Sequence, residues 1–101
     1  MKYALIALAL AATASSPVLA SEALAKSKNC LACHQVEKKV VGPAYKEVAK
    51  KRASEKDAVA LLADHIQKGS KGVYGPVPMP PNANVNPEEA KTLATWIMSL
   101  K

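Results

Sequence analysis

Large aromatic side chains are scarce in this chain of 101 residues, which has no phenylalanine, one tryptophan and three tyrosines. The remaining apolar residues are largely Ala, Val and Leu, so few side chains can fill a large interior. A domain of this size without bulky core residues is poorly equipped to fold unaided. We therefore expect a bound group to occupy part of the interior.

A hydrophobic run long enough to cross a bilayer is also missing. The longest apolar segment, residues 3–12, follows Lys2 and is well short of the roughly 20 residues that a membrane span needs. Residues 15–20 then end on small side chains, with Val18 and Ala20 at the positions that a signal peptidase inspects. This pattern predicts a signal peptide over residues 1–20, cleaved to leave one domain over 21–101. A permanent membrane anchor is the alternative.

Cysteine is rare, and the charge is strongly one-sided. Cys30 and Cys33 could form one disulfide, but its loop would be too short to stabilise much, so the pair indicates chemistry. Residues 21–101 carry 13 basic and 8 acidic side chains, a formal charge of +5. An exported chain in which aromatic and basic residues do not alternate is not expected to bind nucleic acid. Acidic protein faces or anionic membrane surfaces fit this charge, as does a merely soluble surface.

The helical patterns predict an all-α fold of about four helices. Ser21 is a good N-cap for a first helix over residues 22 to about 31, and a second is expected over about 44–52. Ser54 and Asp57 resemble a capping box for a third helix that Gly69 ends. A last helix starts at Asn86 and repeats apolar residues at helical spacing to the C-terminus. No segment has a convincing strand pattern.

The segment between the last two helices is rich in glycine and proline. Residues 69–87 contain three glycines and five prolines within GSKGVYGPVPMPPNANVNP, which excludes regular helix and central strand. Irregular segments this long are more often functional than accidental. We expect the prolines to hold this loop in one shape.

Cys30, Leu31, Ala32, Cys33 and His34 form a C-x-x-C-H motif. This is the signature in which two thiols add to haem vinyl groups and the adjacent imidazole binds the iron. A thioredoxin-like redox pair would need a βαβ framework, which the helical pattern lacks, and a zinc site would need further ligands. The motif therefore predicts one covalently bound haem c, with Cys30 and Cys33 as thioethers and His34 as an iron ligand.

The second iron ligand must come from elsewhere in the chain. Met79 is the expected ligand because it lies between Pro78 and Pro80, in a loop stiff enough to present its thioether. Met98 and His65 are the other neutral candidates, and both fall on expected helices where packing explains them. Ligation by His and Met is an electron-transfer arrangement that raises the reduction potential.

The segments CLACH, VGPAYKEVAKK, GSKGVYGPVPMPPN and AKTLATWIMSLK resemble the bacterial cytochrome c-551 family over essentially all of residues 21–101. The resemblance implies a class I cytochrome c fold around the haem, with His34 and Met79 as axial ligands. It also implies that the Pro43 carbonyl accepts the His34 ring proton and that Asn82 supports the Met79 sulfur. Tyr74 and His65 are implied to lie near a haem propionate, although many relatives have Trp where this chain has Tyr74.

An iron with both axial positions filled favours single-electron transfer over catalysis. The resemblance implies a periplasmic carrier, not an enzyme, between a quinol-oxidising complex and a nitrite reductase or terminal oxidase. A freely diffusing monomer that inserts stably in no membrane is expected. Lysines near the motif would steer it onto redox partners with acidic faces: Lys26, Lys28, Lys38, Lys39, Lys46, Lys50 and Lys51.

Three further hypotheses follow from the same residues. If His65 contacts a propionate, the reduction potential should depend on pH, and a flat potential would contradict this. A ligand-binding or peroxide-reducing haem protein would need a vacant axial position and no Met in the distal loop. A haem subunit permanently docked to a larger enzyme would need an exposed apolar face or a retained anchor.

Overall fold

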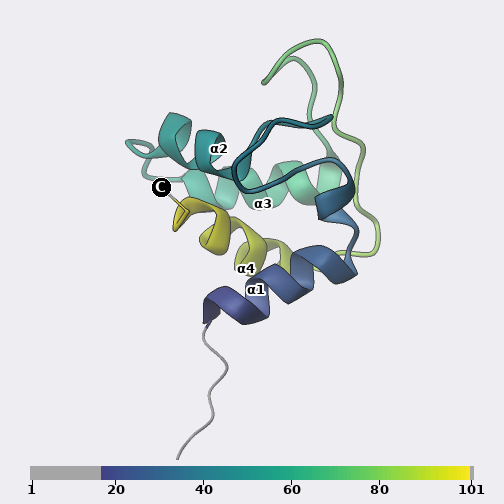
Figure 1. The fold of residues 1–101 in the computed structure, drawn as a ribbon, viewed down its shortest axis with the longest axis vertical. Helices are drawn as coiled ribbons and strands as arrows, with labels where there is room; N and C mark the ends of the chain where they lie inside the picture. Colours follow the sequence, from purple (N-terminus) through teal and green to yellow (C-terminus); the bar gives the residue numbers. More distant parts are fainter. Residues whose placement is uncertain (1–16, 101) are drawn as a thin grey trace, which may run out of the picture.

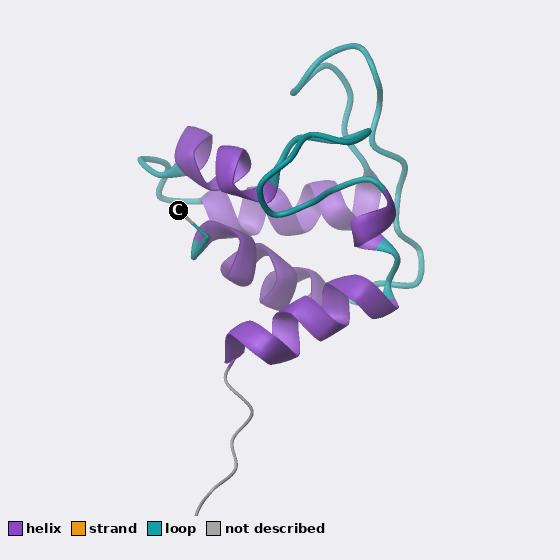
Figure 2. Ribbon diagram, viewed as in Figure 1, coloured by secondary structure: helices purple, strands orange, loops and turns teal. Residues whose placement is uncertain are grey.

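The computed structural model describes residues 17–100, which form four α-helices and one short 3₁₀ helix (Figure 1). In chain order these are α1 (Pro17–Ser27), η1 (Cys30–Ala32), α2 (Tyr45–Arg52), α3 (Ala58–Lys68) and α4 (Pro87–Met98). Within these residues Figure 2 shows helices and loops without a strand, and the only β-type pairings are two isolated bridges. The all-α prediction is confirmed. None of the helices in residues 17–100 has the length and hydropathy that a transmembrane span requires.

Helix α4 is the centre of the packing, because it contacts α1, α2 and α3. Its start is the predicted one: the Asn86 side chain accepts from the Glu89 amide at 2.8 Å, and Glu89 in turn accepts from the Asn86 amide at 3.1 Å. The helix ends at Met98, slightly before the expected C-terminal end. Its buried residues are Ala90, Leu93, Ala94, Trp96 and Ile97.

The first helix differs from the prediction at both ends. It begins at Pro17, so Ser21 is a buried residue inside α1 and not its N-cap. It ends at Ser27 because Asn29 adopts a left-handed conformation, with φ of 61°, which asparagine tolerates better than most residues. The chain then starts anew as η1. The expected signal peptide lies outside the described residues up to residue 16, and cleavage before Ser21 stays a prediction.

The third helix is confirmed, but its expected capping box is wrong. Asp57 occupies the N-cap position of α3, with a φ of −103° and a ψ of 19° and without a side-chain cap hydrogen bond. The end at Gly69, which has a φ of 81°, is as predicted. Ala58, Leu62 and Ile66 follow one another at four-residue spacing and are buried toward α4. Packing of this apolar stripe therefore defines α3 more than its cap does.

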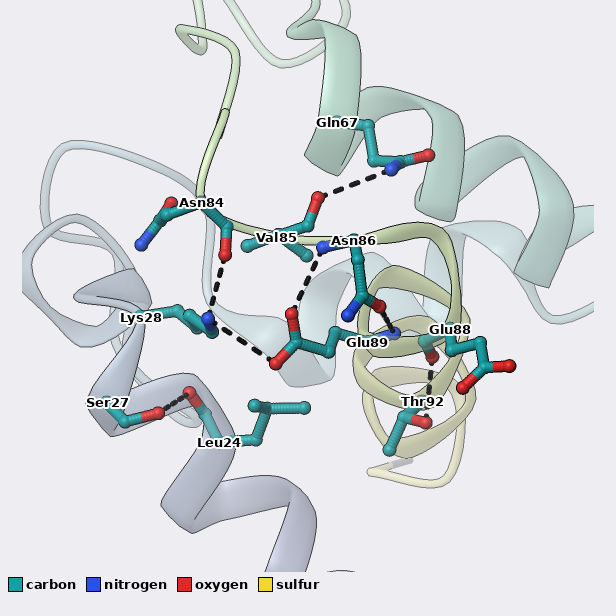
Figure 3. Close-up of polar contacts among 10 residues, drawn as sticks. All are labelled: Leu24, Ser27, Lys28, Gln67, Asn84, Val85, Asn86, Glu88, Glu89 and Thr92. Atoms are coloured by element: carbon teal, nitrogen blue, oxygen red, sulfur yellow. Dashed lines mark hydrogen bonds and ion pairs between the residues drawn. The ribbon is translucent and has the colours of Figure 1, made fainter.

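Lys28 joins the end of α1 to the start of α4 (Figure 3). Its ammonium group donates to the Asn84 carbonyl at 2.7 Å and lies 3.4 Å from the Glu89 carboxylate. Glu89 therefore serves two contacts at once, since it also closes the capping box with Asn86. Lys28, which lies just before Asn29 and Cys30, thereby connects this part of the chain to the end of the loop that precedes α4.

Two long irregular segments, residues 33–44 and 69–86, connect the helices, and the second extends beyond them to the top of the view in Figure 1. The second is the glycine- and proline-rich loop predicted from the sequence. The two segments lie on either side of a cavity, and the candidate site is built from them.

Candidate functional site

A cavity of ≈ 400 Å³ lies between the two loops. This is within the usual range for small-molecule and cofactor sites. The eight residues assigned from the sequence to the haem, its iron or their surroundings all line it: Cys30, Cys33, His34, Pro43, His65, Tyr74, Met79 and Asn82. Met98, the alternative iron ligand, instead packs against the core from α4 and does not line this cavity.

The C-x-x-C-H segment reaches the cavity because the chain forms the short 3₁₀ helix η1 directly after Asn29. The amides of Cys33 and His34 both donate to the Cys30 carbonyl, at 3.2 and 3.0 Å. This single turn sets the two cysteines about one turn apart and brings His34 next to them on the cavity wall. Both thiols are free, with Cys33 exposed and Cys30 half-buried.

Tyr45 shields the Cys30 thiol. Burial raises the pKa of Cys30 above its ordinary value, although a hydrogen bond with Tyr45 acts in the opposite direction. Burial, followed by the neighbouring Cys30, likewise raises the pKa of Tyr45. Both groups are therefore neutral at neutral pH, and Cys30 is held as a thiol.

His34 is oriented by its backbone surroundings. Its Nδ1 lies 2.9 Å from the Pro43 carbonyl oxygen. A carbonyl can only accept, so Nδ1 must carry the proton, and in the neutral ring Nε2 keeps a lone pair for a metal. The ring also stacks on Tyr45, with centroids 5.0 Å apart and planes 19° apart, and Tyr45 meets Trp96 edge-on at 5.4 Å. The imidazole is thus fixed from two sides.

Gly42 and Tyr45 contribute to the site although the sequence did not single them out. A Cβ added to Gly42 would overlap the His34 ring, at 2.7 Å from Nδ1, so only glycine leaves room for the imidazole here. Gly42 and Pro43 together are typical of a turn, and spacing alone does not reveal a contact with His34. Tyr45 was expected only as a helix residue.

Met79 is presented by the opposite loop. Ser70 and Met79 exchange two backbone hydrogen bonds, at 3.0 and 2.9 Å, which close the loop at its base. Gly69 makes this closure possible, because a Cβ there would come within 2.5 Å of the Met79 carbonyl. The Met79 side chain is half-buried and lines the cavity.

Asn82, Tyr74 and His65, the remaining expected residues, also line the cavity, and two of them form hydrogen bonds with other residues of the protein. The side-chain nitrogen of Asn82, Nδ2, donates to the Ile66 carbonyl at 2.8 Å, so this side chain is bound to α3. That Asn82 also supports the Met79 sulfur stays a prediction. The Tyr74 hydroxyl accepts from Arg52 Nε at 3.3 Å. His65 reaches the cavity from α3.

The residues present fit a covalently attached haem. Two free thiols and an imidazole with an available Nε2 line one side of the cavity, and a thioether lines it from the opposing loop. Gly42 leaves the His34 ring space that a larger residue would fill. Zinc fits less well, because no group of three His, Cys, Asp or Glu side chains in residues 17–100 is arranged so that it could hold a metal ion.

Comparison with known proteins shows the family of this chain. The family model for cytochrome c matches residues 18–101. The chain belongs to the cytochrome c family. Among its relatives is cytochrome c-551 of Pseudomonas denitrificans, which is 59% identical over 80 residues, covering 79% of this chain and 96% of that protein. Cytochrome c-552 of Nitrosomonas europaea is 59% identical over 78 residues, covering 77% of this chain and 76% of the relative.

Solved structures of the cytochrome c family have the same fold. The crystal structure of wild-type Nitrosomonas europaea cytochrome c552 matches with a TM-score of 0.78 and 57% identity, over 79% of this chain and 99% of that one. The class 1 cytochrome MtoD of Sideroxydans lithotrophicus matches with a TM-score of 0.68 and 37% identity, over 82% and 95%. The chain has the class I cytochrome c fold, binds one covalent haem c with its iron, and is a small electron carrier.

Proposed function

We propose that residues 21–101 form a periplasmic carrier of single electrons whose iron is ligated by His34 and Met79. The observation that carries this proposal is that one cavity is lined by both cysteines, by His34 and, from the opposing loop, by Met79. When bound, the haem supplies a reversible one-electron change at its iron. His34 and Met79 would both hold the iron and leave no position for a substrate, so the protein would act as a carrier and not as an enzyme.

The protein's own residues provide rigidity. Cys30 and Cys33 would anchor the cofactor, and the Pro43 carbonyl keeps the proton of His34 on Nδ1. Tyr45 stacks on the ring, and the paired backbones of Ser70 and Met79 hold the thioether. Such fixed donors change little between the two oxidation states, which favours fast electron transfer.

Three more side chains are assigned to the surroundings of the cofactor. His65 and Tyr74 line the cavity with polar groups and are proposed to face the propionates. Asn82 is already held to Ile66 through its amide nitrogen, and this nitrogen has a second hydrogen that can support the Met79 sulfur.

The rim of the cavity is the proposed site of electron exit. The large hydrophobic residues exposed in the described chain, Val40, Val41 and Val77, are 46%, 53% and 61% exposed, and all three line this cavity. Lys39 lines it as well. An apolar rim with a cationic border suits a brief contact with an acidic redox partner.

The lysines named from the sequence are not equivalent in this role. Lys46 is paired with Glu37 at 2.6 Å and Lys28 with Glu89, so part of their charge is compensated. Lys38 and Lys39 are exposed on the loop that carries Val40 and Val41. Electrons would come from a quinol-oxidising complex and leave to a nitrite reductase or terminal oxidase, with the protein acting as a monomer.

The test is the optical spectrum of the matured ferric protein. Sulfur ligation gives a weak long-wavelength charge-transfer band, which we expect in the wild type and not in Met79→Ala. Met98→Ala is the matched control, since this methionine lies outside the cavity, and it should keep the band. A high-spin wild-type spectrum without the band would reject the carrier with two filled positions in favour of the ligand-binding or peroxide-reducing alternative.

A further inference from the structure

The tip of the Met79 loop has few attachments of its own. Between Ser70 and Met79, residues 71–78 take part in no backbone–backbone hydrogen bond of the described chain. Most of them are exposed, and only Val73 and Tyr74 are half-buried. Yet Val73, Tyr74 and Val77 line the cavity, so this tip covers the site.

The polar attachments of the tip come from the last turn of α2. Arg52 Nε donates to the Tyr74 hydroxyl at 3.3 Å, and Lys51 donates to the Val73 carbonyl at 3.3 Å. The Lys51 ammonium also lies 4.6 Å from the centre of the Tyr74 ring. Two adjacent cations thus hold one aromatic residue by its edge and its face.

Arg52 is well placed to be rigid. Its side chain is only 12% exposed, and its Nη1 donates to both carboxylate oxygens of Glu55, at 3.0 and 3.1 Å. It also sits at the C-terminal end of α2, where a positive charge is favourable. Because α2 packs on α4, the clamp connects the loop tip to the core of the fold.

We propose that Lys51 and Arg52 are positioning residues that hold residues 71–78 over the cavity, with Tyr74 as the point of attachment. This rests on the proposed function, because it assigns the clamp the task of keeping foreign ligands from displacing Met79. Loss of the clamp lets the tip open while the base, paired through Ser70 and Met79, stays closed.

The test is the rate at which imidazole binds the ferric holoprotein. Arg52→Met and Tyr74→Phe should each accelerate binding about tenfold, as expected for one lost hydrogen bond with a charged donor. The double variant should be no faster than the faster single variant, because both changes remove the same contact. Lys51→Met should also accelerate binding, whereas Lys50→Met, which removes the same charge one residue earlier, should match the wild type.

Nuclear magnetic resonance order parameters provide a second measurement that does not depend on iron ligation. The backbone order parameters of Gly72, Val73 and Tyr74 should fall in Arg52→Met, while those in α3 and α4 keep wild-type values. Unchanged imidazole binding and order parameters in Arg52→Met would overturn the proposal, and so would multiplicative effects in the double variant. Equal acceleration in Glu55→Gln would also overturn it, since the ion pair would then be the cause. A wild type that lacks the sulfur band rejects the proposed ligation, but the order parameters still decide whether the clamp exists.

Discussion

The two loops around the cavity differ in where their stabilising contacts come from. The segment from Cys30 to Pro43 is stabilised mainly by its near neighbours, through the turn at Cys30 and the bond between His34 and Pro43. Apart from the pairing of Ser70 and Met79 at its base, the Met79 loop depends on distant side chains, which come from Lys28 after α1, from α2 and from the contact of Asn82 with α3. Damage to a distant support should therefore loosen the Met79 loop alone, whereas damage within the first segment should prevent the holoprotein from forming correctly.

The largest effect is expected at the base of the Met79 loop. Gly69→Ala combines a positive φ with overlap against the backbones of Met79 and Pro81, neither of which can move aside easily. We expect a loss of about 4 kcal/mol in the free energy of unfolding, and loss of the sulfur band. Gly72→Ala is the control, because its φ is 68° but its Cβ meets open space, and it should cost about 1 kcal/mol. Chemical denaturation of both variants measures the difference, and equal losses would show that overlap is unimportant.

Gly42→Ala tests the first segment. The new Cβ would press on the His34 ring, which Tyr45 blocks on another side, so the ring must tilt. We expect about 2–3 kcal/mol of destabilisation from overpacking, together with a changed spectrum of the imidazole-ligated iron. Thermal unfolding and the optical spectrum are the measurements. A variant with wild-type stability and spectrum would mean that the segment is not as tightly built as described.

The contact that Lys28, just before the first segment, makes with Asn84 and Glu89 should have a smaller effect that depends on pH. The Asn86 amide, followed by Lys28, lowers the pKa of Glu89 below its usual value. A lowered carboxyl pKa stabilises the fold above the ordinary glutamate pKa, and this contribution is lost as the pH falls through the folded value. Glu89→Gln should therefore reduce stability at neutral pH and lose less on acidification than the wild type. Unfolding measured from pH 7 to 3 tests this, with the exposed Glu88→Gln as control.

The smallest expected effect concerns the rim. Lys39→Gln should slow electron transfer to an acidic acceptor about twofold at low ionic strength, and the difference should vanish in high salt. Lys91→Gln removes a charge from α4, outside the cavity, and should leave the rate unchanged. Stopped-flow kinetics with a purified nitrite reductase would measure both. Equal slowing by the two variants would indicate net charge and not a docking rim.

Residues of the site could be predicted from the sequence where a residue and its immediate neighbours in the chain form a recognisable pattern. Cys30, Cys33 and His34 are a contiguous motif, and Met79 stands out between two prolines. Gly42 and Arg52 were missed because their importance lies in contacts with His34 and Tyr74, which sequence spacing does not reveal.

The fold shows the same division. The start of α4 at Asn86 could be predicted because its capping box joins residues that are close in the sequence. The start of α1 and the absence of a side-chain cap at Asp57 were not predicted, since helix packing overrode the local signals there.

The unequal exposure of the two cysteines bears on how the protein matures. Cys33 is open to solvent, whereas Cys30 is half-buried and forms a hydrogen bond with Tyr45. A chain that folded first would offer one sulfur to an incoming haem and shield the other. We therefore expect the bond at Cys30 to form while the chain is still partly open, so that this small domain completes its folding around the attached cofactor.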